Sequence, residues 1–363
     1  MTQEKPPEDK KDQDLVKNIF ERNKQEPASK KMSSLFGGAP PAALKTLNAE
    51  KKKTVKELSP VGIELGEGRI TVIQLGKSNG QLEVLKSASK NVQNVRGSIR
   101  QFLSENGMSG DAVIGLSAND VQFRILNLPP MPPAEVEGAV TWGAAEALGI
   151  DTRRIEDYSI DYAVISPDET SNRGKKIFVA AVRRDLAAEK MKEVTEAGLN
   201  VIAIEPSALA LYAAFCAHSS DVPEASRLTL VLNIGLESSY LVIAAGHDVY
   251  TVQMIAFTEK NLRGALNDEG EVLSQSSASA FENLIVDIEH SYKSVSNQFP
   301  DAGSMSLGSI AVSGPGAKQK GITAFLKKTF NIPSEVFDPL KAGTEFAAAV
   351  GLAARGKEED EAL

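Results

Sequence analysis

The chain has 363 residues, of which 42% are hydrophobic; this is enough to bury one or two cores, and the length suggests two domains. The net charge is −8, but residues 1–56 hold 13 Lys/Arg and 8 Asp/Glu, so the body is strongly acidic, which argues against nucleic-acid binding. No apolar stretch is long enough to span a membrane, there is no apolar signal core, and the single Cys216 excludes an internal disulfide framework, so we expect a cytoplasmic protein.

Residues 1–56 are rich in Lys and Pro and poor in aromatic residues, a composition typical of a disordered tail. Within this tail, apolar residues at 15, 16, 19 and 20 predict a short amphipathic helix over residues 14–23. Such a helix is too short to be stable alone, so it would fold on a partner or at a membrane surface. The alternatives are chance spacing and a solvated basic linker. Residues 356–363 are expected to form an acidic tail.

The first half of the chain begins with strand patterns at 61–66, 69–75 and 81–86, followed by a helix over 95–105 and a buried strand at 112–116. An inserted subdomain is then predicted over residues 119–183. It contains strands at 121–128, 158–165 and 177–182 and a helix over 133–147 that carries the only tryptophan, Trp142. A helix over 185–197 follows.

The second half repeats this plan. Strands are predicted at 228–234, 239–245, 249–255 and 309–313, and helices at 259–268, 278–298, 316–330 and 343–355. A three-strand meander followed by alternating helices and strands, occurring twice, predicts two α/β domains with a ligand cleft between them. We assign residues 57–205 to domain one and 206–355 to domain two, with a small helical subdomain near 256–307. Glu205, at the crossing, is expected to cap a helix beginning at Pro206 or else to face the cleft.

Two passages, at residues 61–75 and 230–243, each read as strand, glycine turn, strand. Glycine lets backbone amides approach an anion closely, and two facing hairpins would hold a phosphate from both sides. A third passage, 310–317, is an apolar strand that ends in a turn of small residues. The candidate binding residues in the three passages are Glu64, Gly66, Gly68, Asn233, Gly235, Ser238, Ser239, Gly314 and Gly316.

In order and spacing, these passages resemble the two phosphate loops and the adenosine loop of the actin-like ATPases, and among them the PilM family of type IV pilus assembly proteins. Residues 124–132 resemble the inserted subdomain of that family, residues 179–182 and 203–210 the crossing between domains, and residues 337–340 and 347–355 its last helix. The resemblance covers roughly residues 58–355. It implies a duplicated, ribonuclease H-like α/β fold with an interdomain cleft, and ATP as the candidate cofactor.

Several residues depart from the family pattern. Both first strands of the family end in an Asp that positions Mg²⁺, whereas this chain has Glu64, which is one methylene longer, and Asn233, which carries no charge. Glu67 adds a carboxylate near the phosphates, and Pro315 removes an amide donor. The stretch 254–280 lacks the Gly pair and the Ala-Glu-x-x-Lys that flank the base in the family. We therefore expect ATP binding to be weakened or lost and predict no catalytic or metal-binding residue.

The resemblance implies a binding role. Proteins of the PilM type hold the cytoplasmic N-terminal peptide of the bitopic inner-membrane protein PilN between the inserted subdomain and the rest of domain one. The resemblance thus implies a PilN-like partner and contacts with other subunits of a pilus, secretion or competence machine. It also implies a homo-oligomeric ring and a peripheral position at the inner membrane. Two alternatives remain: an active ATPase with ATP-driven switching, and an FtsA-like filament former, although residues 357–363 contain no amphipathic helix.

Overall fold

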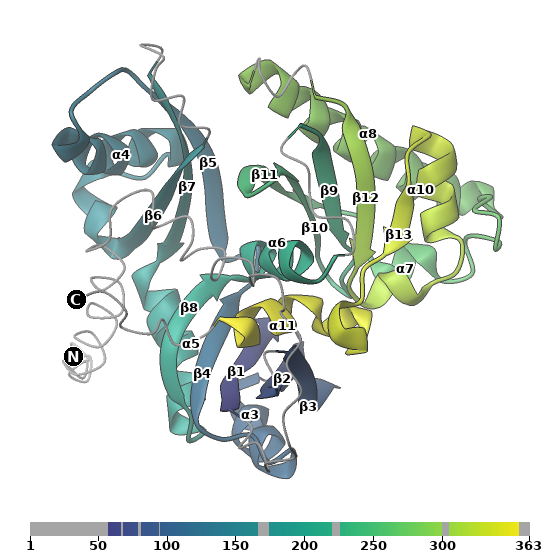
Figure 1. The fold of residues 1–363 in the computed structure, drawn as a ribbon, viewed down its shortest axis with the longest axis horizontal. Helices are drawn as coiled ribbons and strands as arrows, with labels where there is room; N and C mark the ends of the chain where they lie inside the picture. Colours follow the sequence, from purple (N-terminus) through teal and green to yellow (C-terminus); the bar gives the residue numbers. More distant parts are fainter. Residues whose placement is uncertain are drawn as a thin grey trace, which may run out of the picture.

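The computed structural model describes residues 57–355, apart from residues 67, 79–80, 94, 166–173, 220–225 and 300–304. The predictions for residues 1–56, for residues 356–363 and for Glu67 lie outside the described residues. Figure 1 shows three lobes: one sheet at the bottom, a second at the right and a smaller one at the upper left. Two helices, α6 (Ser207–His218) and α11 (Ala347–Ala354), lie at the centre, between the two larger sheets.

The first sheet has the strand order β3-β2-β1-β4-β8. An antiparallel meander is followed by two strands parallel to β1, and on one face the apolar residues of two helices pack against the sheet. Helix α11 covers the opposite face. Burial on both faces explains why its inner strands are nearly continuous apolar runs. The elements are β1 (Glu57–Gly66), β2 (Arg69–Ser78), β3 (Gln81–Asn91), α3 (Val95–Glu105), β4 (Asp111–Leu116), α5 (Arg184–Glu196) and β8 (Asn200–Pro206).

The second sheet repeats the topology of the first, with the order β11-β10-β9-β12-β13. Its central strand β9 pairs antiparallel with β10 and parallel with β12, as β1 does with β2 and β4. This duplicated actin-like α/β architecture, with a cleft between the halves, is the fold class predicted from the sequence. The elements are β9 (Leu228–Asn233), β10 (Ser239–Ala245), β11 (Asp248–Ile255), α7 (Glu259–Leu262), α8 (Gln275–Gln298), β12 (Leu307–Ser313), α10 (Ile322–Phe330) and β13 (Ser334–Val336).

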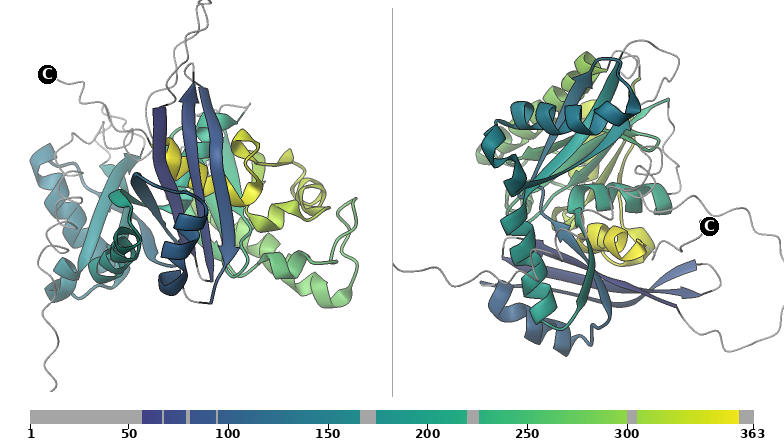
Figure 2. Two further views of the ribbon diagram at one scale, coloured as in Figure 1. Left: turned by 90° about the horizontal axis from the view of Figure 1, so that it is seen from below. Right: turned by 90° about the vertical axis from the view of Figure 1, so that its left-hand side faces the viewer.

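The inserted sheet lies between β4 and α5 in the chain and has the order β5-β7-β6. Helix α4 begins at a proline, which suits the first helical turn, and ends at Gly149 with φ 66°. It packs one apolar stripe on the inserted sheet and lies on its outer side, away from the second sheet (Figures 1 and 2). The other face packs against β11. The elements are β5 (Val121–Leu128), α4 (Pro133–Leu148), η1 (Thr152–Asp157), β6 (Tyr158–Ile165) and β7 (Lys175–Arg183).

The two central helices are apolar all round because they are buried between the two sheets. Helix α11 approaches both α6 and β1 at backbone contact distance. A Cβ atom at Gly351 would lie 1.9 Å from the Ala210 carbonyl oxygen, and one at Gly62 would lie 2.2 Å from the Ala349 carbonyl oxygen. Only glycine fits at these two positions, so α11 is closely packed against both α6 and the first sheet.

The structure differs from the predicted elements where the chain turns within a predicted helix. The helix predicted over 259–268 ends at Leu262, because Gly264 has φ 63° and a bridge pairs Leu266 with Val272. The helix predicted over 316–330 is divided by Gly321, with φ 84°, into η2 (Pro315–Lys318) and α10. The strands β8 and β13 were not predicted. The last predicted helix starts later, after η3 (Pro339–Lys341) and η4 (Thr344–Phe346).

Candidate functional site

The β1–β2 and β9–β10 hairpins face each other across one cleft between the halves of the molecule. The turns meet there because each follows the end of the central strand of its own sheet. Five of the nine predicted binding residues line the cleft: Glu64, Gly66, Asn233, Gly235 and Ser238. The lining also includes residues that the sequence did not single out as binding residues, among them Arg69, Thr71, Ser117, Ser207, Tyr240 and Glu345.

Glu64 is the carboxylate of the first hairpin, and it lies near the end of β1. Burial raises the pKa of the Glu64 carboxyl to about 7, against the smaller lowering effects of a hydrogen bond from Ser207 and of the Arg69 guanidinium. The hydroxyl of Ser207, at the start of α6, is itself buried. Near neutral pH this carboxyl therefore carries only part of its negative charge, which reduces its attraction for a divalent cation.

The second hairpin uses its polar groups to hold its own turn. The Gly235 amide donates to the Ser239 hydroxyl at 3.0 Å, and the Gly235 carbonyl accepts from the Glu259 amide at 2.8 Å. Ser239 is fully buried and does not line the cleft. A Cβ at Gly235 would lie 2.0 Å from the Ser238 carbonyl oxygen, so the tight turn requires glycine. The Gly235 amide and the Ser239 hydroxyl oxygen are thus bonded to each other within the turn.

The third passage packs directly onto this second hairpin. The Gly316 amide donates to the Ile234 carbonyl at 2.9 Å, and the Gly314 amide donates to the Thr344 carbonyl at 3.1 Å. Gly314 has φ 82°, and a Cβ there would lie 2.6 Å from the Asn233 side-chain oxygen. Of this turn only Pro315, which has no N–H, lines the cleft. Gly68 of the first hairpin also lies outside the lining.

Three buried polar atoms on cleft residues have no hydrogen-bond partner among the described residues: Arg69 Nε, Tyr240 Oη and Glu345 Oε2. They come from three separate segments of the chain. Burial, and then the charge of Glu64, raise the pKa of Tyr240 well above its ordinary value. The other carboxylate oxygen of Glu345 accepts from Lys318 at 2.6 Å. Unpaired buried polar groups are costly, so these atoms mark where water or a bound group would be stabilising.

The prediction for Glu205 was wrong. Its carboxylate neither caps α6, whose first turn has no side-chain cap, nor lines the cleft. Instead it forms an ion pair with Arg355, just after α11. Both side chains are largely buried, so the pair fixes the end of α11 against the end of β8.

Neither a metal cluster nor a membrane-spanning helix is found in the part of the chain that the structure describes. No three His, Cys, Asp or Glu side chains converge there as ligands of a metal ion. No helix among residues 57–355, outside the gaps given above, is both long and apolar enough to cross a bilayer.

Comparison with known proteins gives a family and a fold. A family model described as type IV pilus assembly protein PilM matches residues 62–262, more than half of the chain. A solved PilM–PilN type IV pilus biogenesis complex matches with a TM-score of 0.61 and 21% identity, over 82% of this chain and 98% of the other.

Two further solved structures match the chain less closely. The cytoplasmic domain of EpsL, an inner membrane component of the Vibrio cholerae type II secretion system, has a TM-score of 0.43 and 12% identity over 82% and 95% of the two chains. MreB5 of Spiroplasma citri bound to ADP has a TM-score of 0.40 and 10% identity over 80% and 94%. No curated protein matches the chain.

Proposed function

The chain belongs to the type IV pilus assembly protein PilM family, and we propose that it acts as a cytoplasmic actin-like scaffold of a type IV pilus or a related secretion or competence machine. The observation that carries this proposal is the family match itself, which spans the β1–β2 and β9–β10 hairpins and the whole inserted sheet. In this proposal the protein is held at the inner membrane by its partners, contacts other subunits of the machine and forms a homo-oligomeric ring.

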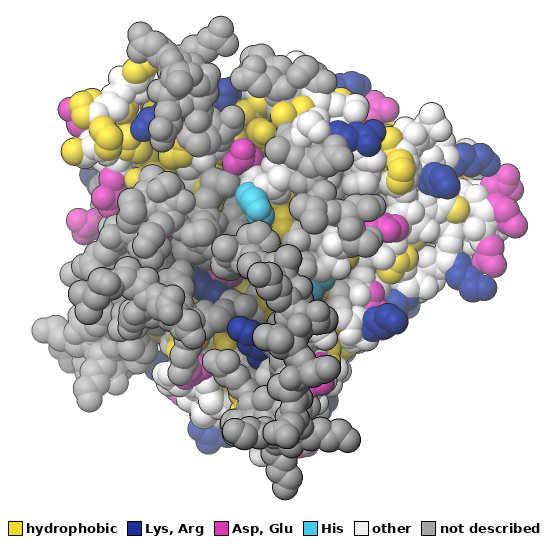
Figure 3. Space-filling view, in the orientation of Figure 1, with side chains coloured by type: hydrophobic (Ala, Val, Ile, Leu, Met, Phe, Trp, Pro, Cys, Tyr) yellow, Lys and Arg dark blue, Asp and Glu magenta, His cyan; other side chains and the backbone are white. Residues whose placement is uncertain are grey.

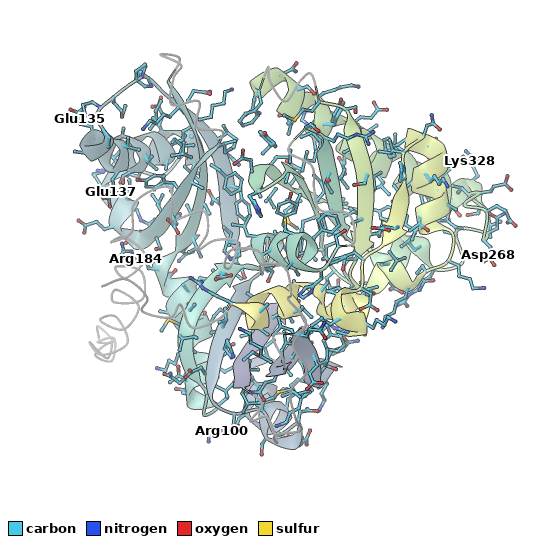
Figure 4. The ribbon with its side chains drawn as sticks, in the orientation of Figure 1. Arg100, Glu135, Glu137, Arg184, Asp268 and Lys328 are labelled. Carbon is cyan, nitrogen blue, oxygen red and sulfur yellow. The ribbon has the colours of Figure 1, made fainter. Side chains whose placement is uncertain are left out.

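The proposed partner is a PilN-like bitopic inner-membrane protein that presents a short cytoplasmic peptide. The similar fold of a protein solved in a PilM–PilN complex supports this partner. An extended peptide can be held by apolar pockets and main-chain hydrogen bonds without any catalytic residue. We place the peptide between the inserted sheet and the rest of the first half, where Arg184 of α5 donates to the Tyr158 carbonyl of β6 at 2.9 Å. Figure 4 shows Arg184 at this junction.

A peptide titration tests this placement. We expect the full-length protein to bind a synthetic N-terminal peptide of its PilN-like partner, and Arg184→Gln to weaken binding roughly tenfold or more, because a charged hydrogen bond that joins the two walls is lost. Arg100→Gln is the matched control. Arg100 also donates to a backbone carbonyl, that of Glu196, but it lies on α3 far from the inserted sheet (Figure 4). Equal affinities for the two variants, or no binding by the unmodified protein, would contradict the proposal.

We also propose that nucleotide binding in the cleft is weakened or lost. Asn233 brings no charge to the cleft, and the amides of Gly235, Gly314 and Gly316 are all donated within the protein. Of the charged side chains in the lining, three are carboxylates and one is Arg69. Glu237 and Glu345 are paired with Lys260 and Lys318, so within the lining Arg69 is the side chain that would attract a polyphosphate. A scaffold role does not need this site, so the proposed function survives its loss.

Thermal denaturation with Mg-ATP tests this second proposal. A ligand at a hundred times its Kd stabilises a protein by ~2.7 kcal/mol, which is readily seen as a rise in Tm. We expect millimolar Mg-ATP to leave the Tm unchanged. A clear rise that Gly235→Asp abolishes would instead support an active ATPase, and nucleotide-dependent polymers in a pelleting assay would support a filament former.

A further inference from the structure

Helix α4 exposes most of a large aromatic side chain. Trp142 is 62% exposed and lies in the middle of the helix. Gly138, one turn before it, has nothing within 4 Å of its Cβ position, and the same holds for Gly149 at the end of the helix. The indole thus projects from an open surface between two positions without side chains. An exposed tryptophan of this kind is unusual, since its large apolar area gains free energy when covered.

Acidic side chains flank this tryptophan on the same face of α4. Glu146 follows it by one helical turn and Glu135 precedes it by two, which places them ~6 Å and ~10 Å away along the axis. Both are exposed. Figure 3 shows hydrophobic side chains gathered over α4, bordered by acidic ones, and Figure 4 shows Glu135 on the outer side of the helix. Of the nearby cations, Arg153 and Arg154 of η1 are paired with Asp151 and Asp157, and Arg124 of β5 donates to the Ala147 carbonyl in the last turn of α4.

A surface of this kind fits an apolar segment that carries positive charge. A cation over an indole face is attracted by the π electrons of the ring, and the negative charges of Glu135 and Glu146 attract the same cation. The chain itself contains such a segment outside the described structure. Residues 15–24 include four apolar residues within six positions and three cations, namely Leu15, Val16, Ile19, Phe20, Lys17, Arg22 and Lys24.

We propose that the Trp142 face of α4, made by Glu135, Gly138, Trp142 and Glu146, docks the N-terminal segment 15–24 of this same chain. The tail joins the structure at Glu57, so more than thirty residues separate the segment from β1. A random-coil chain of that length would span roughly 30 Å on average and much more when extended. Covalent attachment gives the segment an effective concentration near millimolar, so even weak contacts favour docking within one molecule.

The single tryptophan of the chain makes this proposal directly measurable. In the full-length protein we expect Trp142 at low salt to have a blue-shifted emission and to be protected from acrylamide quenching. Protection should fall in 1 M salt, where the Debye length is ~3 Å. The variant Lys17→Glu/Arg22→Glu/Lys24→Glu should lose it as well, each removed charge pair lowering the docked-to-free ratio roughly two- to fivefold. The matched control Lys51→Glu/Lys52→Glu/Lys53→Glu makes the same charge change elsewhere in the tail and should keep the protection.

A charge exchange gives the sharpest outcome. Glu135→Lys/Glu146→Lys should expose Trp142 as the tail variant does, and combining the two sets of changes should restore protection. The proposal is overturned if Trp142 of the unmodified protein is as accessible as in the variants, or if the control exposes it equally. Protection that depends on protein concentration would assign the face to a second copy, and protection that appears only with anionic vesicles would assign it to a membrane; either result also overturns the proposal.

Discussion

The two halves of the molecule share one strand order but use the ends of their central strands differently. In the first half, Glu64 on β1 is aligned with Thr71 and Gly115 of its neighbouring strands. In the second half, Asn233 on β9 is aligned with Tyr240 and Ser313. The first hairpin leaves a buried carboxyl with a pKa near 7 and an unpaired guanidinium nitrogen, whereas the second bonds its turn internally and leaves a neutral tyrosine hydroxyl unpaired among the described residues. One strand order thus ends its central strand in an ionisable side chain in one half and in a neutral one in the other.

The largest expected effect tests a contrast between the outer strands. Glu205 lies on β8, beside Gly115 of β4, and the residue at the corresponding place in the second half, just after β13, is the apolar Phe337. Arg355→Met would leave the buried Glu205 carboxylate unpaired, and we expect a loss of about 3–5 kcal/mol in the free energy of unfolding, measured by urea denaturation.

Two controls accompany this measurement. Arg153→Met removes a cation from an exposed pair with Asp151 and should change stability by less than about 1 kcal/mol. Glu205→Gln/Arg355→Met should recover much of the loss, because no charge remains buried. If Arg355→Met were as mild as Arg153→Met, the pair would not hold α11 in place.

The next effect concerns the strained carboxyl of the first turn. Its pKa is raised from 4.5 to about 7, so between these values the folded protein holds a proton that the unfolded chain has released. Stability therefore falls as pH rises from about 4.5 to 7, by about 3 kcal/mol. Glu64→Gln should remove this fall and stabilise the protein at pH 8 while leaving it nearly unchanged at pH 4.5, as measured by denaturant titration across the pH range.

The matched control is Glu237→Gln in the opposite hairpin. Glu237 forms an exposed ion pair with Lys260, so its removal should have little effect at either pH. A pH dependence that persists in Glu64→Gln would show that another group is responsible.

A paired glycine substitution compares the two turns themselves. A Cβ at Gly235 would meet the Ser238 carbonyl oxygen at 2.0 Å, whereas one at Gly66 would meet nothing closer than 3.9 Å. Neither residue has a positive φ. We expect Gly235→Ala to cost about 1–3 kcal/mol through steric strain and Gly66→Ala to be close to neutral, both measured as shifts in thermal unfolding. Equal costs would contradict the difference in turn packing.

The smallest expected effect comes from a comparison of the hydroxyl groups of two buried tyrosines. Tyr240 Oη lacks a partner among the described residues, while Tyr212 Oη donates to the Gly246 carbonyl at 2.7 Å. We expect Tyr240→Phe to be neutral or to stabilise by up to about 1 kcal/mol and Tyr212→Phe to cost about 1 kcal/mol. Calorimetry of both variants without added ligand measures the difference. A loss on Tyr240→Phe as large as that of Tyr212→Phe would show that this hydroxyl is already satisfied.

Local sequence chemistry predicted the elements whose signals lie within a few residues. Both glycine hairpins, α3 and α4 begin and end close to their predicted positions, because alternating apolar residues, a proline start and glycine ends are local features. The short strand β13 has three residues and no such pattern. The approach of Arg69, Tyr240 and Glu345 joins segments more than 100 residues apart, and the amides of Gly314 and Gly316 are used by distant carbonyls, so neither was visible in the sequence.

The packing of α11 on β1 has a consequence for synthesis on the ribosome. β1 is the first strand of the first sheet, yet the helix that covers one of its faces ends only at Ala354. At 5–20 residues per second, roughly 15–60 s separate the emergence of the strand from that of its cover. During that time the nascent first sheet exposes a hydrophobic surface, which makes it a candidate client for chaperones until α11 has been synthesised.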